Sequence, residues 1–276
     1  MPSRENKISI ITINYNNKEG LQNTFSSVFS QTLQSFEYII IDGGSSDGGE
    51  KLIEEYKERF AYWICEPDKG IYNAINKGLK KASGEYILIL NSGDSLFSSK
   101  VLEEVISLLS SGEDVIYGES LDYNIPEPIS EFHFIPPSKL DFSFFLKDSL
   151  RHQAVFIKKE LHDRVGHYDE NYAIVSDWKF LLLAIGKWDA SYKKIDHVIC
   201  RYDRQGISSI NKELDQKERC RVLKEHFSFY VRDEVEIKAM PSIYMRILKV
   251  FALFVPYGFI AGYKILLKKI QKLKSL

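Results

Sequence analysis

The chain has 276 residues, of which 44% are hydrophobic and 27% are charged, and its formal net charge is −1. This composition is typical of a globular protein of one or two domains, and it excludes a disordered chain and a polytopic membrane protein. The near-zero net charge gives no reason to expect nucleic acid as a partner.

The first 120 residues alternate between strand-like and helix-like segments. Apolar and β-branched runs predict strands at residues 8–13, 36–41, 61–65, 86–90 and 115–117, and apolar residues at helical spacing predict helices at 21–29, 50–60, within 66–78 and at 100–110. Such alternation implies βαβ units. We therefore expect an α/β fold with a mostly parallel sheet and helices on both faces.

Polar residues follow three of these strands, namely Asn14, Asp42 and Asp94. In open α/β sheets, ligands bind outside the carboxyl ends of the strands. The glycines after Asp42 let the backbone approach a ligand, and its carboxylate can accept hydrogen bonds from ribose hydroxyls or a base N–H. Asp47 could bind the same ligand or cap the next helix. The GxGxxG and GxxxxGK[ST] motifs do not occur, so neither dinucleotide nor P-loop binding is supported.

Asp94 and Lys69 are the residues with which this edge could hold a phosphate. Mg²⁺ commonly binds one or two carboxylates together with substrate phosphates, so Asp94 could hold a cation, although it could also be a plain turn residue. Lys69, between Asp68 and Gly70, is a candidate contact for a phosphate or a sugar.

The pattern is less regular after residue 120. Residues 123–150 contain four prolines among many aromatic residues and predict an irregular wall of the site. Helices are predicted at 159–165, 176–185 and 213–229, and strand-like pieces at 190–195 and 198–202.

Two residues of this second half could take part in proton transfer. Asp177 stands at a predicted helix start within an otherwise apolar segment and is the candidate general base. An Asp in a first helical turn also complements the helix dipole without any catalytic role, so both interpretations stay open. His152 is a polar residue just before an apolar strand predicted at 154–157, and it is either structural or part of the site.

Four motifs, in this order and at this spacing, resemble family 2 glycosyltransferases. They are residues 11–16 (ITINYN), 42–48 (DGGSSDG), 66–78 (EPDKGIYNAINKG) and 90–94 (LNSGD). The resemblance covers roughly residues 7–210 and is nearest to the bacterial polysaccharide enzymes of the colanic-acid type. It implies a GT-A fold, with a Rossmann-like nucleotide-sugar-binding half at 7–120 and a variable acceptor half at 121–240.

The resemblance also implies roles for single residues. Thr12, Asn14 and Asp42 would surround the nucleotide, usually uridine, and Asp68 and Lys69 would lie near the ribose, diphosphate or sugar. The remaining expected donor contacts are Asn76, Asn91 and Ser208, the last in a Gly-x-Ser-Ser piece at 206–209. Asp94 would hold Mg²⁺ or Mn²⁺ on the diphosphate, and Asp177 would be the base. On the acceptor side we expect His152 and Trp178.

Two departures from the family pattern limit these expectations. The family's DxD metal element reads Asn-Ser-Gly-Asp at 91–94, which leaves one carboxylate for the metal. The Gln-x-x-Arg-Trp element of processive synthases is absent, which favours a single-transfer enzyme.

The expected activity is therefore inverting transfer of a sugar from a nucleotide-sugar, with UDP as the expected nucleotide, to a hydroxyl of a glycan or lipid-linked glycan during cell-surface polysaccharide synthesis. The alternatives are a non-catalytic sugar- or lipid-binding scaffold on a degenerate transferase fold and a nucleotidyltransferase.

Residues 241–276 form a basic and apolar segment. They contain seven Lys or Arg and no Asp or Glu, so residues 1–240 carry a net charge of −8. The uncharged run at 250–263 is shorter than the ~20 residues that span a bilayer. With its flanking lysines it suits an anchor on anionic lipid, and the other interpretation is a helix packed on the body of the protein.

Cysteine use and the N-terminus bear on location. The three cysteines are far apart and lack CxxC spacing, which argues against disulfides or a zinc site and favours a reducing compartment. The polar residues Met1–Lys7 run directly into a predicted strand. We therefore expect a cytoplasmic protein without a signal peptide, peripheral on the inner membrane face if residues 241–276 bind lipid.

Overall fold

The computed structural model describes residues 7–124, 130–206 and 210–238, with side chains described as far as Phe227. Contacts divide the chain into two compact units, residues 1–219 and 220–276. Ser208 and the basic segment at 241–276 lie outside the described residues, so the predictions made for them stay predictions. Within the described ranges, no helix is both long enough and apolar enough to cross a membrane.

One nine-stranded sheet forms the centre of the first unit. Its strands are β1 (Ile8–Asn14), β2 (Glu37–Asp42), β3 (Tyr62–Cys65), β4 (Tyr86–Ile89), β5 (Ser95–Leu96), β6 (Val115–Tyr123), β7 (Glu131–Phe134), β8 (Val155–Lys158) and β9 (Tyr192–Asp203). Their order is β3-β2-β1-β4-β8-β6-β9-β5, and β7 pairs with β6. The strands β3, β2, β1 and β4 are parallel. Beyond β4 the sheet is mixed, because β8 runs antiparallel to both of its neighbours while β9 runs parallel to β6.

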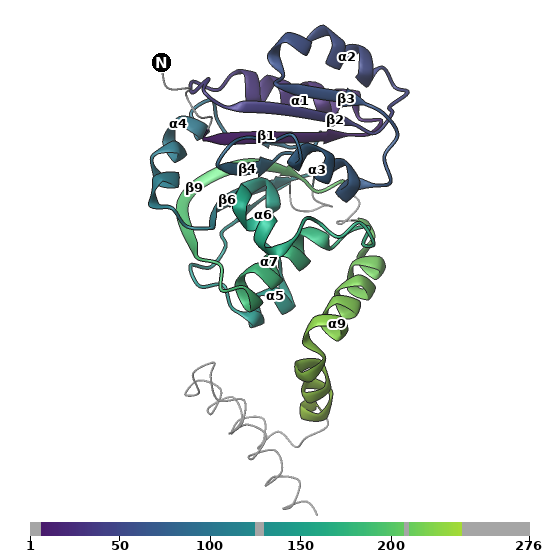
Figure 1. Ribbon diagram of the computed structural model, residues 1–276, viewed down its shortest axis with the longest axis vertical. Helices are drawn as coiled ribbons and strands as arrows, with labels where there is room; N and C mark the ends of the chain where they lie inside the picture. The colour runs from purple at the N-terminus through teal and green to yellow at the C-terminus, as the bar shows by residue number, and fades with distance from the viewer. Residues whose placement is uncertain (1–6, 125–129, 207–209, 239–276) are drawn as a thin grey trace, which may run out of the picture. The chain divides into compact units, whose positions relative to one another are not determined.

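Helices cover both faces of this sheet (Figure 1). The helices of the first unit are α1 (Lys18–Phe29), α2 (Gly49–Glu55), α3 (Ile71–Leu79), α4 (Val101–Ile106), α5 (Phe142–Lys147), α6 (Lys159–Val165) and α7 (Ser176–Lys187), with short 3₁₀ turns η1 (Lys57–Arg59), η2 (Leu108–Ser111) and η3 (His152–Ala154). The helix α9 (Lys212–Lys238) begins in the first unit and continues into the second. The helical geometry of α9 is interrupted at Phe227. The predicted α/β architecture is confirmed.

Successive side chains of a strand point to opposite faces of the sheet, and this explains why helices can pack on both faces. Ile8 and Ile10 of β1 point to one face, where they join a buried cluster with residues of α1, α2 and α4. Ile11 points to the other face, where α3 packs so closely that a Cβ on Gly78 would lie 2.6 Å from Ile11 Cγ2. Both faces are therefore buried, which is why these parallel strands consist largely of apolar residues.

Three predictions for the chain beyond residue 114 differ from the structure. The strand predicted at 115–117 continues to Tyr123, and the two pieces predicted at 190–195 and 198–202 form the single strand β9, which pairs with β6 across register shifts. The segment 123–150, predicted to be irregular, contains β7 and α5. β7 reads Glu-Phe-His-Phe, an alternation of polar and aromatic residues over only four positions, of which Phe134 alone is buried.

Candidate active site

Asn14 and Asp42 meet at the carboxyl ends of two adjacent parallel strands, as their places in the sequence predict. They are register partners of β1 and β2, and Asn14 Nδ2 donates a 2.7 Å hydrogen bond to Asp42 Oδ2. Asp42 is fully buried and also accepts the backbone N–H groups of Gly44 and Ser45. The buried Asn14 Oδ1 has no hydrogen-bond partner among the described residues. A donor group from a ligand or water would therefore stabilise this end of the sheet.

Gly43, Tyr15 and Asp68 lie together beside this pair, and we call the place that these residues form with Asn14 and Asp42 the slot. A Cβ on Gly43 would overlap the Asp68 carboxylate and lie 3.3 Å from the Tyr15 ring, so only glycine lets these groups approach one another. Tyr15 is 65% exposed, so its ring is accessible to a ligand. Lys69 is exposed next to Asp68. Tyr15 directly follows Asn14 in the sequence but was not among the predicted site residues.

Two of the expected donor contacts use their side chains within the protein. Thr12 is fully buried, and its hydroxyl lies 3.1 Å from the hydroxyl of Tyr38. Asn76 is 4% exposed and bonds both backbone groups of Tyr168 and the carboxylate of Glu170. These bonds fix α3 to the loop that precedes α7. The expected ligand contacts of Thr12 and Asn76 stay predictions.

Most of the other predicted site residues line one cavity of about 730 Å³. Asn91, Asp94, His152, Asp177 and Trp178 all line it, although they come from the end of β4, from η3 and from α7. The loop after β1 joins the cavity to the slot: Asn16 N–H bonds Ser45 on the slot side, and Asn17 lines the cavity and bonds the carbonyl of Ser92.

Asp94 lies in the cavity wall at the end of the buried strand. It is 3% exposed, and its two oxygens accept hydrogen bonds from Gln153 Nε2 at 2.7 Å and from the N–H of Asp203 at 2.9 Å. Burial raises the pKa of Asp94 to about 7, and these two hydrogen bonds only partly oppose the effect of burial. A cation near Asp94 would therefore strongly stabilise its ionised form.

The carboxylate of Asp203 lies near Asp94. The sequence predicted one metal-binding carboxylate at this place, whereas the structure has two. Asp203 follows Tyr202 at the end of β9 and lines the same cavity. Its Oδ1 accepts two hydrogen bonds, whereas its Oδ2 has none among the described residues and lies 3.5 Å from the position of a Cβ on Gly93. Three or more His, Cys, Asp or Glu side chains do not gather at any one place in the described ranges. Two carboxylates nevertheless suffice for a magnesium-type site that is completed by substrate phosphates.

Asp177 is held by hydrogen bonds to both of its carboxylate oxygens. Tyr72 donates its hydroxyl proton to Oδ1 at 2.8 Å, and His152 Nδ1 lies 3.0 Å from Oδ2. Burial opposes ionisation, but the hydrogen bond and charge of His152 and the hydrogen bond from Tyr72 outweigh it, so the pKa of Asp177 is lowered. The side chain is 19% exposed. Asp177 is thus an ionised carboxylate with its remaining lone pairs open to the cavity.

His152 links Asp177 to the metal-binding edge through Asn91. Its Nε2 lies 3.1 Å from Asn91 Nδ2, and the buried Asn91 Oδ1 has no partner among the residues described. If the amide is turned over, Oδ1 accepts a proton from Nε2 while Nδ1–H donates to Asp177, which satisfies an imidazolium completely. In the other orientation, Asn91 Nδ2 donates to Nε2. In either case, His152 fixes the orientation of Asp177.

Tyr72, Gln153 and Asp203 are contacts of the key carboxylates that sequence reasoning missed. The carbonyl of Ile174 also lies within hydrogen-bond reach of the Tyr72 hydroxyl, so the single hydroxyl proton is shared between this carbonyl and Asp177 at the start of α7. Gln153 is 2% exposed, and a polar residue next to His152 at the start of an apolar strand was the only signal for it. Asp203 gave no local signal, because β9 brings it to Asp94 from 109 residues away.

The sequence and fold resemble known proteins. Residues 9–168 match the sequence model of the family described as Glycosyl transferase family 2. An uncharacterised glycosyltransferase of Mycobacterium tuberculosis is 32% identical over 212 residues, which are 73% of this chain and 77% of that protein. A PGL/p-HBAD biosynthesis glycosyltransferase of Mycobacterium bovis is 28% identical over 177 residues, or 62% of this chain and 67% of that protein.

Two solved structures share the fold at 18% sequence identity. Staphylococcus aureus TarS 1–349, in complex with UDP-GlcNAc, superposes with a TM-score of 0.58 over 71% of this chain and 58% of that one. The mannosyltransferase PcManGT of Pyrobaculum calidifontis, in complex with GDP-Man and Mn²⁺, superposes with a TM-score of 0.57 over 84% of this chain and 66% of that one. The chain thus spans about three fifths of the length of the TarS structure.

Proposed function

Because the chain belongs to glycosyl transferase family 2, we propose that it transfers a sugar from a nucleotide-sugar to a hydroxyl of a glycan or lipid-linked glycan, with inversion at the anomeric carbon. It is a glycosyltransferase with the GT-A fold, as its motifs predicted. One observation carries the proposal: a single cavity holds the strand-end carboxylate Asp94 and the ionised carboxylate Asp177. The colanic-acid subgroup and a role in cell-surface polysaccharide synthesis remain part of the proposal.

The nucleoside part of the donor would occupy the slot at the ends of β1 and β2. The exposed Tyr15 ring offers a face for the base, and the Asp68 carboxylate beside Gly43 can accept from ribose hydroxyls. The orphaned Asn14 Oδ1 can accept a base N–H. UDP is the proposed nucleotide. The two structural neighbours bind UDP-GlcNAc and GDP-Man, which supports a nucleotide-sugar donor in general.

The donor diphosphate would lie between the slot and the cavity, at Asp94 and Asp203. These two carboxylates are the groups that would hold Mg²⁺ or Mn²⁺. When bound, the cation supplies positive charge that stabilises the departing nucleoside diphosphate. Gln153 and the backbone of Asp203 keep the Asp94 oxygens oriented towards it.

Asp177 would act as the general base. It accepts the proton of the acceptor hydroxyl while that oxygen bonds to the anomeric carbon, and the bond from this carbon to the diphosphate breaks on the opposite face. The lowered pKa keeps Asp177 ionised at neutral pH, and Tyr72 and His152 hold it in place without occupying all of its lone pairs. A covalent glycosyl-enzyme is not required. An ionised carboxylate that faces the cavity is better explained by a glycosyltransferase than by a nucleotidyltransferase or a non-catalytic scaffold.

A donor screen tests the proposed function directly. We expect the purified chain with Mn²⁺ to release a nucleoside diphosphate from one of UDP-glucose, UDP-galactose, UDP-GlcNAc or GDP-mannose, slowly with water and faster with a glycan acceptor. The product should have the inverted anomeric configuration, which NMR of the new linkage measures. Failure of all four donors both to bind and to react would contradict the proposal.

We expect His152 to position Asp177, the proposed base. This role predicts a change in the pH profile that a purely structural role would not produce. In His152→Gln, kcat should fall about 10- to 100-fold with little change in KM, because Asp177 loses its fixed orientation. The hydrogen bond and charge of His152 lower the pKa of Asp177, so their loss should move the acidic limb of the kcat–pH profile to higher pH. The exposed His133, which pairs with Glu119, provides the matched control His133→Gln. An unshifted acidic limb would remove His152 from this role.

A further inference from the structure

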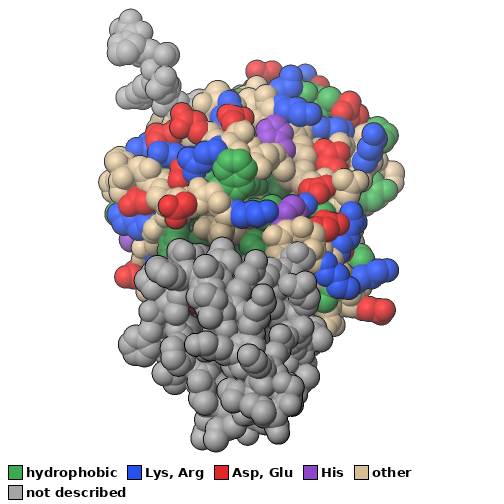
Figure 2. All heavy atoms as spheres, turned by 60° about the horizontal axis from the view of Figure 1, so that its bottom comes forward, with side chains coloured by type: hydrophobic (Ala, Val, Ile, Leu, Met, Phe, Trp, Pro, Cys, Tyr) green, Lys and Arg blue, Asp and Glu red, His purple; other side chains and the backbone are tan. Residues whose placement is uncertain are grey.

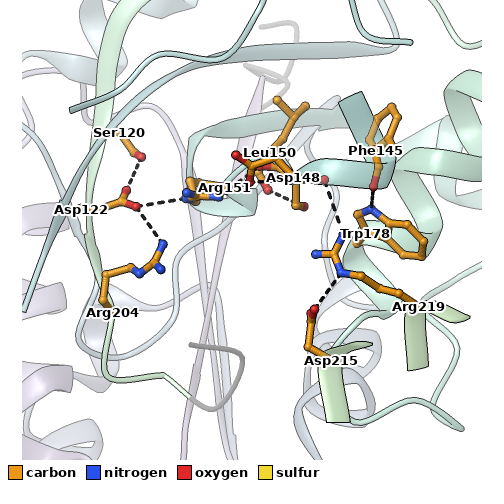
Figure 3. Close-up of polar contacts among 11 residues, drawn as sticks. Ser120, Asp122, Phe145, Asp148, Leu150, Arg151, Trp178, Arg204, Asp215 and Arg219 are labelled. Carbon is orange, nitrogen blue, oxygen red and sulfur yellow. Dashed lines mark hydrogen bonds and ion pairs between the residues drawn. The ribbon is translucent and has the colours of Figure 1, made fainter. Parts of the chain in front are cut away.

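A buried aspartate in β6 holds two arginines at the cavity wall. The Asp122 carboxylate is fully buried, and its Oδ2 accepts Arg151 Nε at 3.2 Å and Arg204 Nη1 at 3.3 Å. Its Oδ1 accepts the hydroxyl of Ser120. Figure 3 shows this carboxylate between the two guanidinium groups. A buried carboxylate is costly unless it is paired, so Asp122 fixes both arginines strongly.

A third arginine joins this network through Asp148. Arg151 Nη1 donates to Asp148 Oδ1 at 3.2 Å, and Arg219 Nη1 donates to the backbone carbonyl of the same residue at 3.5 Å. Arg219 also donates to Asp215 and lies 4.6 Å above the Trp178 ring. In Figure 3, Arg204 and Arg219 lie on opposite sides of Arg151. The three guanidiniums therefore form one continuous, prepositioned group.

Each of these arginines keeps hydrogen-bond donors free. All three line the 730 Å³ cavity. None of their Nη2 atoms has a partner among the described residues, because the bonds that they make use Nε or Nη1. Two exposed lysines, Lys147 and Lys212, line the same cavity. Guanidinium groups that are already fixed bind phosphate oxygens at a lower entropic cost than mobile ones.

On the face shown in Figure 2, Lys and Arg side chains are mixed with Asp, Glu and hydrophobic side chains, so no broad basic field is present there. The network holds three arginines and three aspartates, so an anion would be bound by the fixed guanidinium donors and not by an excess of positive charge.

We propose that Arg151, Arg204 and Arg219 form a subsite that binds a phosphate group of the acceptor, separate from the donor diphosphate at Asp94. This inference rests on the proposed function. The three arginines come from the acceptor half of the chain, whereas the donor slot is built from β1, β2 and the loop before α3. Arg219 stacks on Trp178, and Trp178 directly follows Asp177. The network therefore lies where an acceptor can place a hydroxyl at the base and a phosphate ester at the arginines.

Calorimetry on the full chain saturated with UDP and Mg²⁺ tests this subsite. The probes are geranyl phosphate for a lipid-linked phosphate, glycerol 3-phosphate for a soluble one, and geraniol as the uncharged control. We expect at least one phosphate to bind, and geraniol to bind at least about tenfold more weakly than geranyl phosphate. Arg219→Gln and Arg204→Gln should each weaken phosphate binding at least about tenfold, since each removes charge-assisted hydrogen bonds. The affinity for UDP should change less than about twofold in Arg219→Gln.

Arg164→Gln is the matched control, because Arg164 is an exposed arginine that pairs with Asp114 and does not line the cavity. It should leave phosphate binding unchanged. The proposal is overturned if saturating UDP abolishes phosphate binding, if Arg219→Gln weakens UDP as much as the phosphate, or if neither phosphate binds. If the protein fails to bind UDP, the proposed donor is wrong, and the same phosphate titration without UDP still decides the subsite by its dependence on Arg219.

Discussion

Replacing Asp177 with Asn should reduce sugar transfer ~10²–10⁴-fold, the usual cost of losing a general base. The amide has the same shape as the carboxylate and can still accept the Tyr72 hydroxyl proton at its oxygen, so the start of α7 should keep its geometry. An amide cannot accept the acceptor's proton at neutral pH. The loss should therefore appear in kcat, while donor affinity stays within about twofold because the slot at Asn14 and Asp42 is untouched.

Steady-state kinetics and calorimetry with the donor nucleotide measure these two quantities separately. Asp163→Asn is a suitable control, since Asp163 is exposed on α6 and does not line the cavity. It should turn over at the rate of the unchanged chain. Near-normal turnover in Asp177→Asn would remove this residue from the role of base. A matching fall in donor affinity would instead indicate that the residue contacts the donor.

The donor half could be predicted well because its signals are local. The apolar run of β4 and the polar residues directly after β1, β2 and β4 lie within a few residues of the strands that position them. The rule that ligands bind at the carboxyl ends of parallel strands then brings Asn14 and Asp42 together without knowledge of any contact. The pairing of β1 with β2 in register confirms that placement.

The acceptor half could not be predicted to the same depth, because its contacts are distant in sequence. Asp203 reaches Asp94 only through the long strand β9, which the sequence analysis divided into two pieces. The arginine network depends on Asp122, which belongs to the part of β6 beyond the predicted strand. A charged residue in a polar-looking segment gives no hint that it is fully buried. It becomes visible only in the sheet, where Asp122 pairs with Phe132 of β7 on one side and with Tyr202 of β9 on the other.

Asp94→Asn should weaken the metal-dependent binding of UDP at least about tenfold, because the site loses the more buried of its two carboxylates. Its pKa of about 7 adds a pH dependence. Below pH 7 the carboxyl group is protonated and neutral, and it must release that proton before it can hold a cation. The affinity for Mn²⁺ in the presence of UDP should therefore rise as the pH increases from about 6 to 8 and level off above that range.

Calorimetry in two buffers of different ionisation enthalpy counts the released proton directly. Near pH 6 the unchanged chain should release close to one proton for each Mn²⁺ bound, whereas Asp94→Asn should release fewer, since an amide has none to lose. Asp203→Asn should weaken Mn²⁺ while keeping the proton release, because burial raises the pKa of Asp94 more than the Asp203 charge does. Equal Mn²⁺-dependent UDP affinity in the unchanged chain and in Asp94→Asn would show that the cation is held elsewhere. The comparison thus separates a site centred on the buried strand end from one centred on β9.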